Sequence, residues 1–125
     1  MADLKAGVEL IVGARWDPRF GPTVLVGMGG TATEVLRDVQ VALAPVDHDE
    51  ATRMIARLRT AALLGEHRGR MAVDIAAAAR VVARLSQYAA GHPEIAELEI
   101  NPLLVTPSGA TALDARIVKN HTENH

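Results

Sequence analysis

Residues 93–118 read PEIAELEINPLLVTPSGATALDARIV, and this stretch decides the expected fold more than any other. Two apolar runs, at 95–106 and 110–118, predict β-strands because they are short and rich in aliphatic residues. The Pro-Ser-Gly sequence between them, at 107–109, is typical of a tight turn. We therefore expect an antiparallel β-hairpin in the C-terminal part of the chain.

The hairpin carries polar side chains in a regular pattern. Glu97, Glu99 and Asn101 alternate along the first strand, so they point to one face. A turn near 107–108 would bring Asp114, on the returning strand, opposite residues close to Asn101. Carboxylate and amide oxygens on one face suit Mg²⁺, which commonly bridges to nucleotide phosphates. A solvated acidic strand face explains the same pattern, although an unpaired carboxylate at Asp114, inside an apolar strand, would be costly.

Upstream of the hairpin, the pattern predicts a mostly antiparallel sheet covered by helices, which is an α+β domain. Further strands are expected at 8–14, 23–27 and 39–44, and helices at 31–37, from Asp47 onward, and between Asp74 and Gly91. The sequence WDPRFGP at 16–22 suits a tight connection, so the first two strands should pair. Asp47 and Asp74 are expected N-caps, and Gly91 followed by Pro93 is an expected helix end.

The composition fits one domain with an aliphatic core. Of 125 residues, 49% are hydrophobic but only 2% aromatic, so thin layers of Ala, Val, Leu and Ile are expected. The absence of cysteine excludes disulfides and thiolate metal sites. A net charge of −2 argues against a nucleic-acid partner. No apolar stretch approaches the ~18 residues of a membrane span, and no signal peptide opens the chain. We therefore expect a cytoplasmic protein with no membrane partner.

Two further features could contact a nucleotide. Gly27-Met28-Gly29-Gly30 precedes a predicted helix, and glycine backbone amides at a helix start suit a phosphate. An ordinary turn explains the same glycines. Glu9 lies in the first predicted strand on the same face as Ile11, where a solvated or salt-bridged residue is the simplest interpretation. The five histidines form no pair at helical spacing, so zinc is not expected.

Several segments, in the same order, resemble the ATP-grasp domain of ADP-forming acyl-CoA (acetyl-CoA) synthetases, a family related to the β subunit of succinyl-CoA synthetase. They are GVELIVGARWDPRFGPTVLVGMGGTATEVLRDVQVALAPV at 7–46, LLGEHRG at 63–69, PEIAELEINPLLV at 93–105 and ALDARI at 112–117. The resemblance implies the C-terminal lobe of an ATP-grasp domain over residues 1–118, with a polar tail at 119–125. It favours the magnesium interpretation of the hairpin over a solvated face.

The resemblance also implies roles for single residues. Asn101 and Asp114 match Mg²⁺ ligands of the family, with Glu99 beside them as a contributor. The positions that match the nucleotide and phosphate site are Glu9, Gly29, Gly30 and Glu34. The family's phosphorylated histidine matches none of the histidines here, so no catalytic residue is assigned.

The first lobe of the family, with its phosphate-gripping lysine and adenine hinge, precedes the matched segment, and Lys5 and Lys119 match nothing in the nucleotide site. The matched segments include none of the family's CoA-binding domains. We therefore expect an ATP/ADP- and Mg²⁺-binding lobe of an acid–CoA ligase (acyl-CoA + ADP + phosphate = acid + CoA + ATP), inactive without a partner chain that carries the missing parts. The alternatives are a non-enzymatic interaction or scaffold module, which could be a homodimer, and a relic with no present role.

Overall fold

The computed structural model describes residues 7–29, 38–65 and 72–120, which form an α+β domain. The strands are β1 (Val8–Asp17), β2 (Gly21–Met28), β3 (Val39–Leu43), β4 (Ile95–Thr106), β5 (Gly109–Ala112) and β6 (Ala115–Lys119). The helices are α2 (His48–Ala56), the short 3₁₀ helix η2 (Ala61–Leu64) and α3 (Ile75–Ala90). The helix expected at 31–37 lies outside the described residues, as does most of the loop at 65–70.

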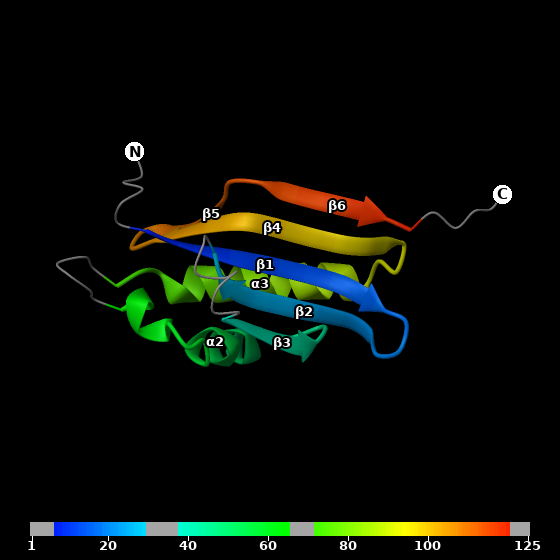
Figure 1. Cartoon of the computed structure of the whole chain (residues 1–125), viewed down its shortest axis with the longest axis horizontal. Helices are drawn as coiled ribbons and strands as arrows, with labels where there is room; N and C mark the ends of the chain where they lie inside the picture. Colours follow the sequence, from blue (N-terminus) through cyan, green and yellow to red (C-terminus); the bar gives the residue numbers. More distant parts are fainter. Residues whose placement is uncertain (1–6, 30–37, 66–71, 121–125) are drawn as a thin grey trace.

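All described strands belong to one antiparallel sheet. Its order is β3-β2-β1-β4-β5 (Figure 1). The strand β6 pairs with the first half of β4, on the same side of β4 as β5. The strand β4 therefore lies between β1 on one side and both β5 and β6 on the other. This confirms the predicted antiparallel sheet and places the C-terminal hairpin beside the first strand of the chain.

The hairpin of β1 and β2 is longer than the sequence pattern predicts. Both strands continue past the expected ends at residues 14 and 23, and the ladder closes with Asp17 opposite Gly21. The Asp17 carboxylate accepts hydrogen bonds from the backbone amides of Arg19 (2.7 Å) and Phe20 (3.2 Å), which closes the turn locally. Gly21 adopts a φ of 83°, a conformation that glycine reaches without steric cost.

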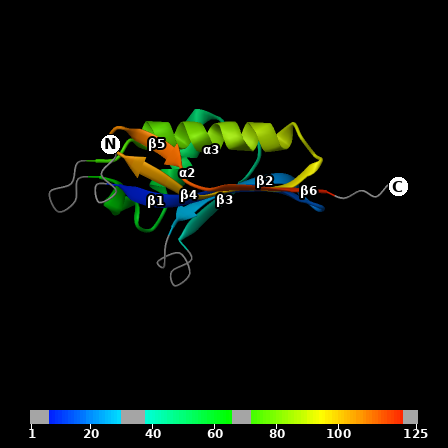
Figure 2. The same cartoon turned by 90° about the horizontal axis from the view of Figure 1, so that it is seen from above.

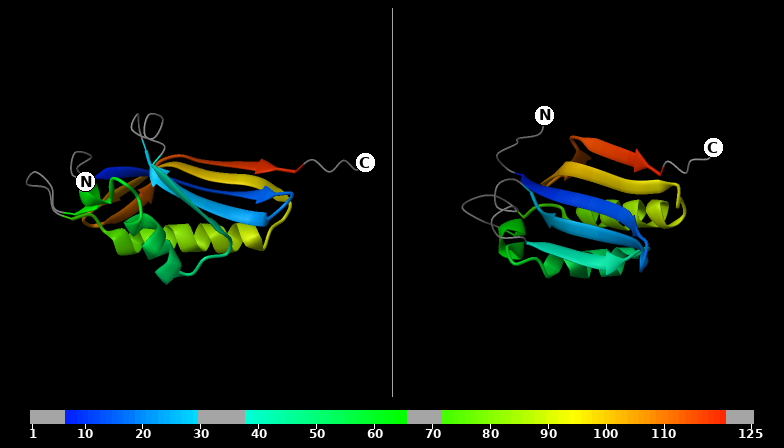
Figure 3. Two further views of the ribbon diagram at one scale, coloured as in Figure 1. Left: turned by 60° about the horizontal axis from the view of Figure 1, so that its bottom comes forward. Right: turned by 45° about the vertical axis from the view of Figure 1, so that its right-hand side comes forward.

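Helices α2 and α3 cover one face of the sheet (Figures 2 and 3). The strand residues on this face are fully buried at Leu10, Val12, Val24 and Val26. They meet an alanine-rich side of α3 whose buried residues are Ala78, Ala79, Val82, Ala83, Leu85, Ser86 and Ala89. The small alanine side chains let the helix approach the strands closely. The core cluster contains no aromatic side chain among the described residues, so the aliphatic core expected from the composition is confirmed.

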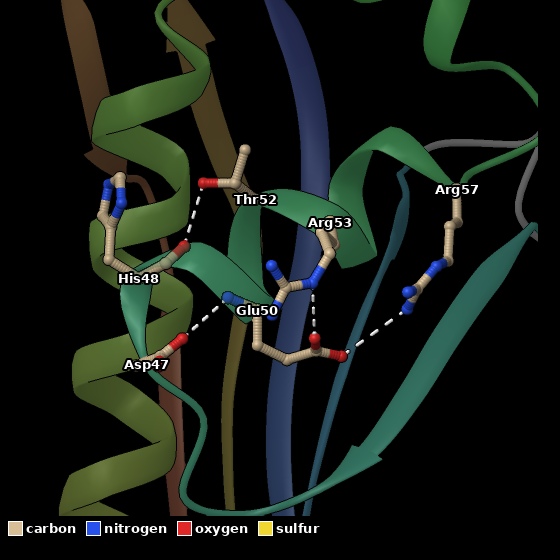
Figure 4. Close-up of polar contacts among 6 residues, drawn as sticks. All are labelled: Asp47, His48, Glu50, Thr52, Arg53 and Arg57. Carbon is tan, nitrogen blue, oxygen red and sulfur yellow. Dashed lines mark hydrogen bonds and ion pairs between the residues drawn. The ribbon is translucent and has the colours of Figure 1, made fainter.

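Both long helices begin at the predicted caps. The Asp47 carboxylate accepts from the Glu50 amide at 2.8 Å, and the Asp74 carboxylate accepts from the Ala77 amide at 3.0 Å. The Glu50 side chain does not return to the cap; it pairs with Arg53 at 2.9 Å and Arg57 at 3.5 Å (Figure 4). These contacts fix where α2 starts and hold its polar side outward.

The single strand predicted at 110–118 is wrong. The chain there forms two strands, β5 and β6, separated at Leu113 and Asp114. The cause lies on the partner strand, because Pro102 has no amide hydrogen and interrupts the regular ladder. Backbone bonds from the Asn101 amide to the Asp114 carbonyl (2.9 Å) and from the Leu113 amide to the Pro102 carbonyl (3.0 Å) bridge the break.

Among the described residues, no helix combines the length and the apolarity that a membrane span requires.

Candidate magnesium and nucleotide site on the open face of the sheet

The sheet face turned away from α2 and α3 carries the candidate functional residues, and we call it the open face (Figure 3). Strand register decides which side chains share it. Gly13 lies opposite Glu99 and Arg15 opposite Glu97, while on the other side of β4 Arg116 lies opposite Glu99. Directly paired residues of antiparallel strands point to the same face. Each glutamate of β4 therefore has one arginine directly opposite it, Arg15 on β1 for Glu97 and Arg116 on β6 for Glu99.

The three predicted metal ligands come together at the break between β5 and β6. Glu99, Asn101 and Asp114 line one hollow of about 110 Å³, together with Ala115 and Arg116. The hydrogen bond between the backbones of Asn101 and Asp114 holds the two strands side by side at this point. The prediction that the hairpin brings Asp114 close to Asn101 is therefore confirmed.

The donor set of this hollow fits a magnesium ion. It offers two carboxylates and one amide oxygen, all partly or fully exposed to solvent. Mg²⁺ prefers oxygen ligands and keeps several of its waters, so a shallow set of few protein ligands is suitable. Within the described ranges, no three His, Cys, Asp or Glu side chains gather closely enough to hold a metal, so a site here depends on the Asn101 amide.

The expectation that an unpaired Asp114 carboxylate would be energetically costly is wrong. Leu113, Asp114 and Ala115 are all exposed, because the chain leaves the regular ladder at this point. A solvated carboxylate carries no large desolvation penalty. The case for Asp114 as a ligand thus rests on its position beside Asn101 and Glu99.

Arg116 is a neighbour of this site that the sequence interpretation missed. Its Nη2 atom lies 3.6 Å from Oε1 of Glu97 and 3.6 Å from Oε1 of Glu99. Exposed ion pairs of this kind contribute only about 0.2–1 kcal/mol to stability. The sequence held a signal for Arg116, because residues 114 and 116 are two apart and would share a face of the single strand predicted at 110–118.

A larger, more apolar hollow of about 380 Å³ lies beside the acidic one on the open face. The residues that line it are Ile11, Gly13, Ala14, Arg15, Thr23, Leu25, Val41, Glu97, Leu98 and Glu99. Sequence interpretation missed the apolar members Leu25 and Val41, because single aliphatic residues in strands are ordinarily read as core. Only their register with Gly13 shows that they point away from the helices.

The start of the glycine loop lies directly beside Glu9. The Gly29 amide donates to the Glu9 carbonyl at 2.8 Å. A Cβ atom at Gly29 would lie 3.1 Å from that carbonyl oxygen, so a side chain there would be crowded by the backbone of Glu9. Glu9 is exposed near the N-terminal end of β1, a central strand of the sheet. The other two predicted positions, Gly30 and Glu34, lie outside the described residues.

Asp38 anchors the chain where it re-enters the sheet after the glycine loop. Its side chain is buried and accepts from the amides of Arg59 (2.6 Å) and Thr60 (2.9 Å) and from the Thr60 hydroxyl. Burial alone would raise the pKa of this carboxyl, but the hydrogen bonds from Thr60 and Arg59 outweigh it and hold the pKa below its usual value. Asp38 therefore fixes the start of β3 to the connection between α2 and η2.

The comparison with known proteins agrees with this geometry. A family model described as an ATP-grasp domain matches residues 1–118. The chain belongs to the ATP-grasp family. The predicted α+β fold of this family is confirmed by a solved structure of acetyl-coenzyme A synthetase 1 from Ca. Korarchaeum cryptofilum, in complex with coenzyme A and Mg-AMPPCP. That structure matches with a TM-score of 0.86 and 40% identity over 91% of this chain and 54% of its own.

Curated relatives of this ATP-grasp chain are ADP-forming acid–CoA ligases. The 4-hydroxybutyrate–CoA ligase of Nitrosopumilus maritimus is 45% identical over 91% of this chain. The β subunit of acetate–CoA ligase I of Pyrococcus furiosus is 38% identical over 92% of it. The chain spans 17% of the length of the first and 50% of the second. It corresponds to the ATP-grasp portion of these ligases, which is consistent with a nucleotide-binding lobe.

Proposed function

We propose that this chain is the C-terminal ATP-grasp lobe, residues 1–118 with a polar tail at 119–125, of an ADP-forming acid–CoA ligase. In that role it binds Mg²⁺ and ATP or ADP, and takes part in the interconversion of acyl-CoA, ADP and phosphate with acid, CoA and ATP. The single observation that carries this proposal is the hollow in which Glu99, Asn101 and Asp114 converge. The ligase names of the curated relatives support it.

The residues have distinct tasks in this proposal. Asn101, Asp114 and Glu99 hold Mg²⁺, which when bound neutralises phosphate charge and orients the phosphates. Gly29, whose own amide donates to the Glu9 carbonyl, begins the loop from which the Gly30 amide would reach the phosphates. Glu9 and Glu34 are the acidic residues of the proposed nucleotide and phosphate site. Ile11, Leu25 and Val41 line the neighbouring hollow and would offer the nucleotide an aliphatic surface. Catalysis itself requires groups on both sides of the phosphates.

The chain alone is therefore proposed to be inactive. A partner chain would supply the first ATP-grasp lobe and the CoA-binding domains, in the cytoplasm. The relative from Pyrococcus furiosus is named as a β subunit, which supports a division of the ligase between chains. The two relatives are named for different acids, 4-hydroxybutyrate in the ligase of Nitrosopumilus maritimus and acetate in that of Pyrococcus furiosus. The acid is accordingly proposed to be recognised outside this lobe.

An NMR titration of the isolated chain tests the proposal. Addition of Mg²⁺ with ADP should shift the backbone amide signals of Asn101, Asp114 and Gly29. The amides of α3, such as that of Arg80 on the opposite layer, serve as the internal control and should not move. No shift at Asn101 and Asp114 at millimolar Mg²⁺ and ADP would contradict a nucleotide-binding lobe.

A non-enzymatic interaction module is the second candidate, and one observation favours it. Val41 and Leu43 are 60% and 63% exposed on β3, the strand at the edge of the described sheet. Exposed apolar edge strands often pair with another chain. A homodimer by light scattering that is unaffected by Mg²⁺ and ADP would support this candidate; a monomer that binds nucleotide would contradict it.

A further inference from the structure

Arg116 lines the same hollow as Glu99, Asn101 and Asp114, but it carries a positive charge. Its guanidinium group lies between the carboxylates of Glu97 and Glu99, 3.6 Å from each. A cation in this place competes with a metal ion for the oxygens of Glu99. The hollow therefore contains its own competitor for magnesium.

The two glutamates depend on Arg116 to different degrees. Glu97 also faces Arg15, which lies directly opposite on β1. Glu99 faces Gly13 on β1, which has no side chain, so Arg116 is the charged residue directly opposite Glu99 on its neighbouring strands. Departure of Arg116 would thus leave Glu97 near a cation and free Glu99 for a metal.

Arg116 is also held loosely enough to leave. Both ion pairs are longer than a hydrogen bond, and the Arg116 side chain is 63% exposed on the strand β6. A guanidinium group offers five donors in a planar fork, which matches the oxygens of a phosphate. Glu99, Asp114 and Arg116 line one hollow. Phosphates bound to a metal ion that Glu99 and Asp114 hold would therefore lie next to the guanidinium group of Arg116.

We propose that Arg116 is a phosphate-binding residue whose guanidinium group pairs with Glu97 and Glu99 in the metal-free protein. A metal–nucleotide complex displaces it from Glu99 and at the same time provides phosphate oxygens for its guanidinium group. Free Mg²⁺ displaces it without that compensation. Arg116 therefore makes the site select the metal–nucleotide complex over the free ion. This inference rests on the proposed function and names a residue that sets its ligand preference.

The test measures two affinities of the full chain for the wild type and Arg116→Gln. Mg²⁺ alone, followed by the amide shifts of Asn101 and Asp114, should bind about threefold to tenfold more tightly to Arg116→Gln, because the competing charge is gone. Mg²⁺ with ADP should bind about tenfold more weakly, because the charge-assisted contact to phosphate is lost. A merely structural role of Arg116 would not move the two affinities in opposite directions.

Two further variants complete the experiment. Arg116→Lys keeps the charge without the fork, so it should retain the weak affinity for Mg²⁺ alone and recover only part of the affinity for the complex. Arg80→Gln removes one positive charge from the exposed side of α3, on the opposite layer, and should change neither affinity. Thermal unfolding should be nearly the same for all three variants, which establishes that they fold.

The outcomes separate this inference from the function on which it rests. The wild type could bind Mg²⁺ with ADP while Arg116→Gln shows unchanged or weaker affinity for Mg²⁺ alone. That result would overturn the claim that Arg116 competes with Mg²⁺ for Glu99. Unchanged affinity of Arg116→Gln for the complex overturns its contact with phosphate. If neither protein shows a shift at Asn101 and Asp114 under any condition, the proposed function and this inference fail together.

Discussion

The two faces of the sheet, built from the same strands, differ in what their side chains do. On the helix-covered face, Leu10, Val12 and Val26 are fully buried against α3. On the open face, Glu99 and Arg116 are half-exposed or exposed and form loose ion pairs. Alternation along each strand keeps these sets apart. Substitutions on the covered face should therefore change stability, whereas those on the open face should change binding.

The largest expected effect is on the covered face. Leu10→Ala should lower the free energy of unfolding by about 3–5 kcal/mol, because it removes buried methyl groups and leaves a cavity under α3. The affinity of the remaining folded protein for Mg²⁺ should not change. Ile11→Ala, one position along β1 but on the open face, is the matched control. Urea denaturation of both variants checks this, and an equal loss of stability would break the contrast between the faces.

Asp38→Asn should cost about 2–3 kcal/mol, because an amide cannot accept all three hydrogen bonds from Arg59 and Thr60 as the carboxylate does. The pH dependence follows from the lowered pKa of Asp38. The contribution of this group is present above the unfolded pKa of about 3.9 and is lost as the pH falls through the lower folded pKa. Unfolding curves from pH 6 down to pH 2 should therefore converge for wild type and variant. A constant difference at every pH would contradict this assignment.

Asp47→Ala should destabilise the protein by about 1 kcal/mol, because it removes the side chain that caps α2 (Figure 4). The helix lies on the covered side, so no effect on ligand binding is expected. Asp49→Ala, an exposed residue in the first turn of the same helix, controls for the loss of one negative charge. Thermal unfolding monitored by circular dichroism compares the two, and an equal shift for both would argue against the cap.

The smallest effect on stability is expected at the candidate metal site. Asp114→Asn should change the free energy of unfolding by less than about 0.5 kcal/mol, because the side chain is exposed and its backbone bond with Asn101 remains. Its affinity for Mg²⁺ should nevertheless fall by about tenfold, which one lost carboxylate ligand would explain. Chemical denaturation and a Mg²⁺ titration on one sample measure both. A large loss of stability would show that the open face is structural after all.

The sequence pattern predicts much of this architecture because its signals are local. Asp47 and Asp74 cap helices through bonds three residues away, and the alternation of Glu97, Glu99 and Asn101 follows from strand geometry. The hairpin turn at 107–109 then suffices to bring Asp114 near Asn101.

What escaped prediction depends on contacts between distant segments. The break at Leu113 and Asp114 arises from Pro102 on the partner strand. The extension of β2 to Gly21 was missed because prolines are read as loop, whereas the Pro22 carbonyl accepts a bond from the Ala44 amide at 2.9 Å. The apolar hollow likewise requires the register that sets Gly13 opposite both Leu25 and Glu99.

The central claim is that the open face is a magnesium-dependent nucleotide site. Its most direct test is the ratio of the dissociation constants of ADP without and with Mg²⁺. Isothermal titration calorimetry gives the dissociation constant of ADP with and without Mg²⁺ for the wild type and for Asp114→Asn. We predict that Mg²⁺ tightens ADP binding by about tenfold in the wild type and by less than about twofold in Asp114→Asn. The same enhancement in both proteins, or none in the wild type, would contradict the claim.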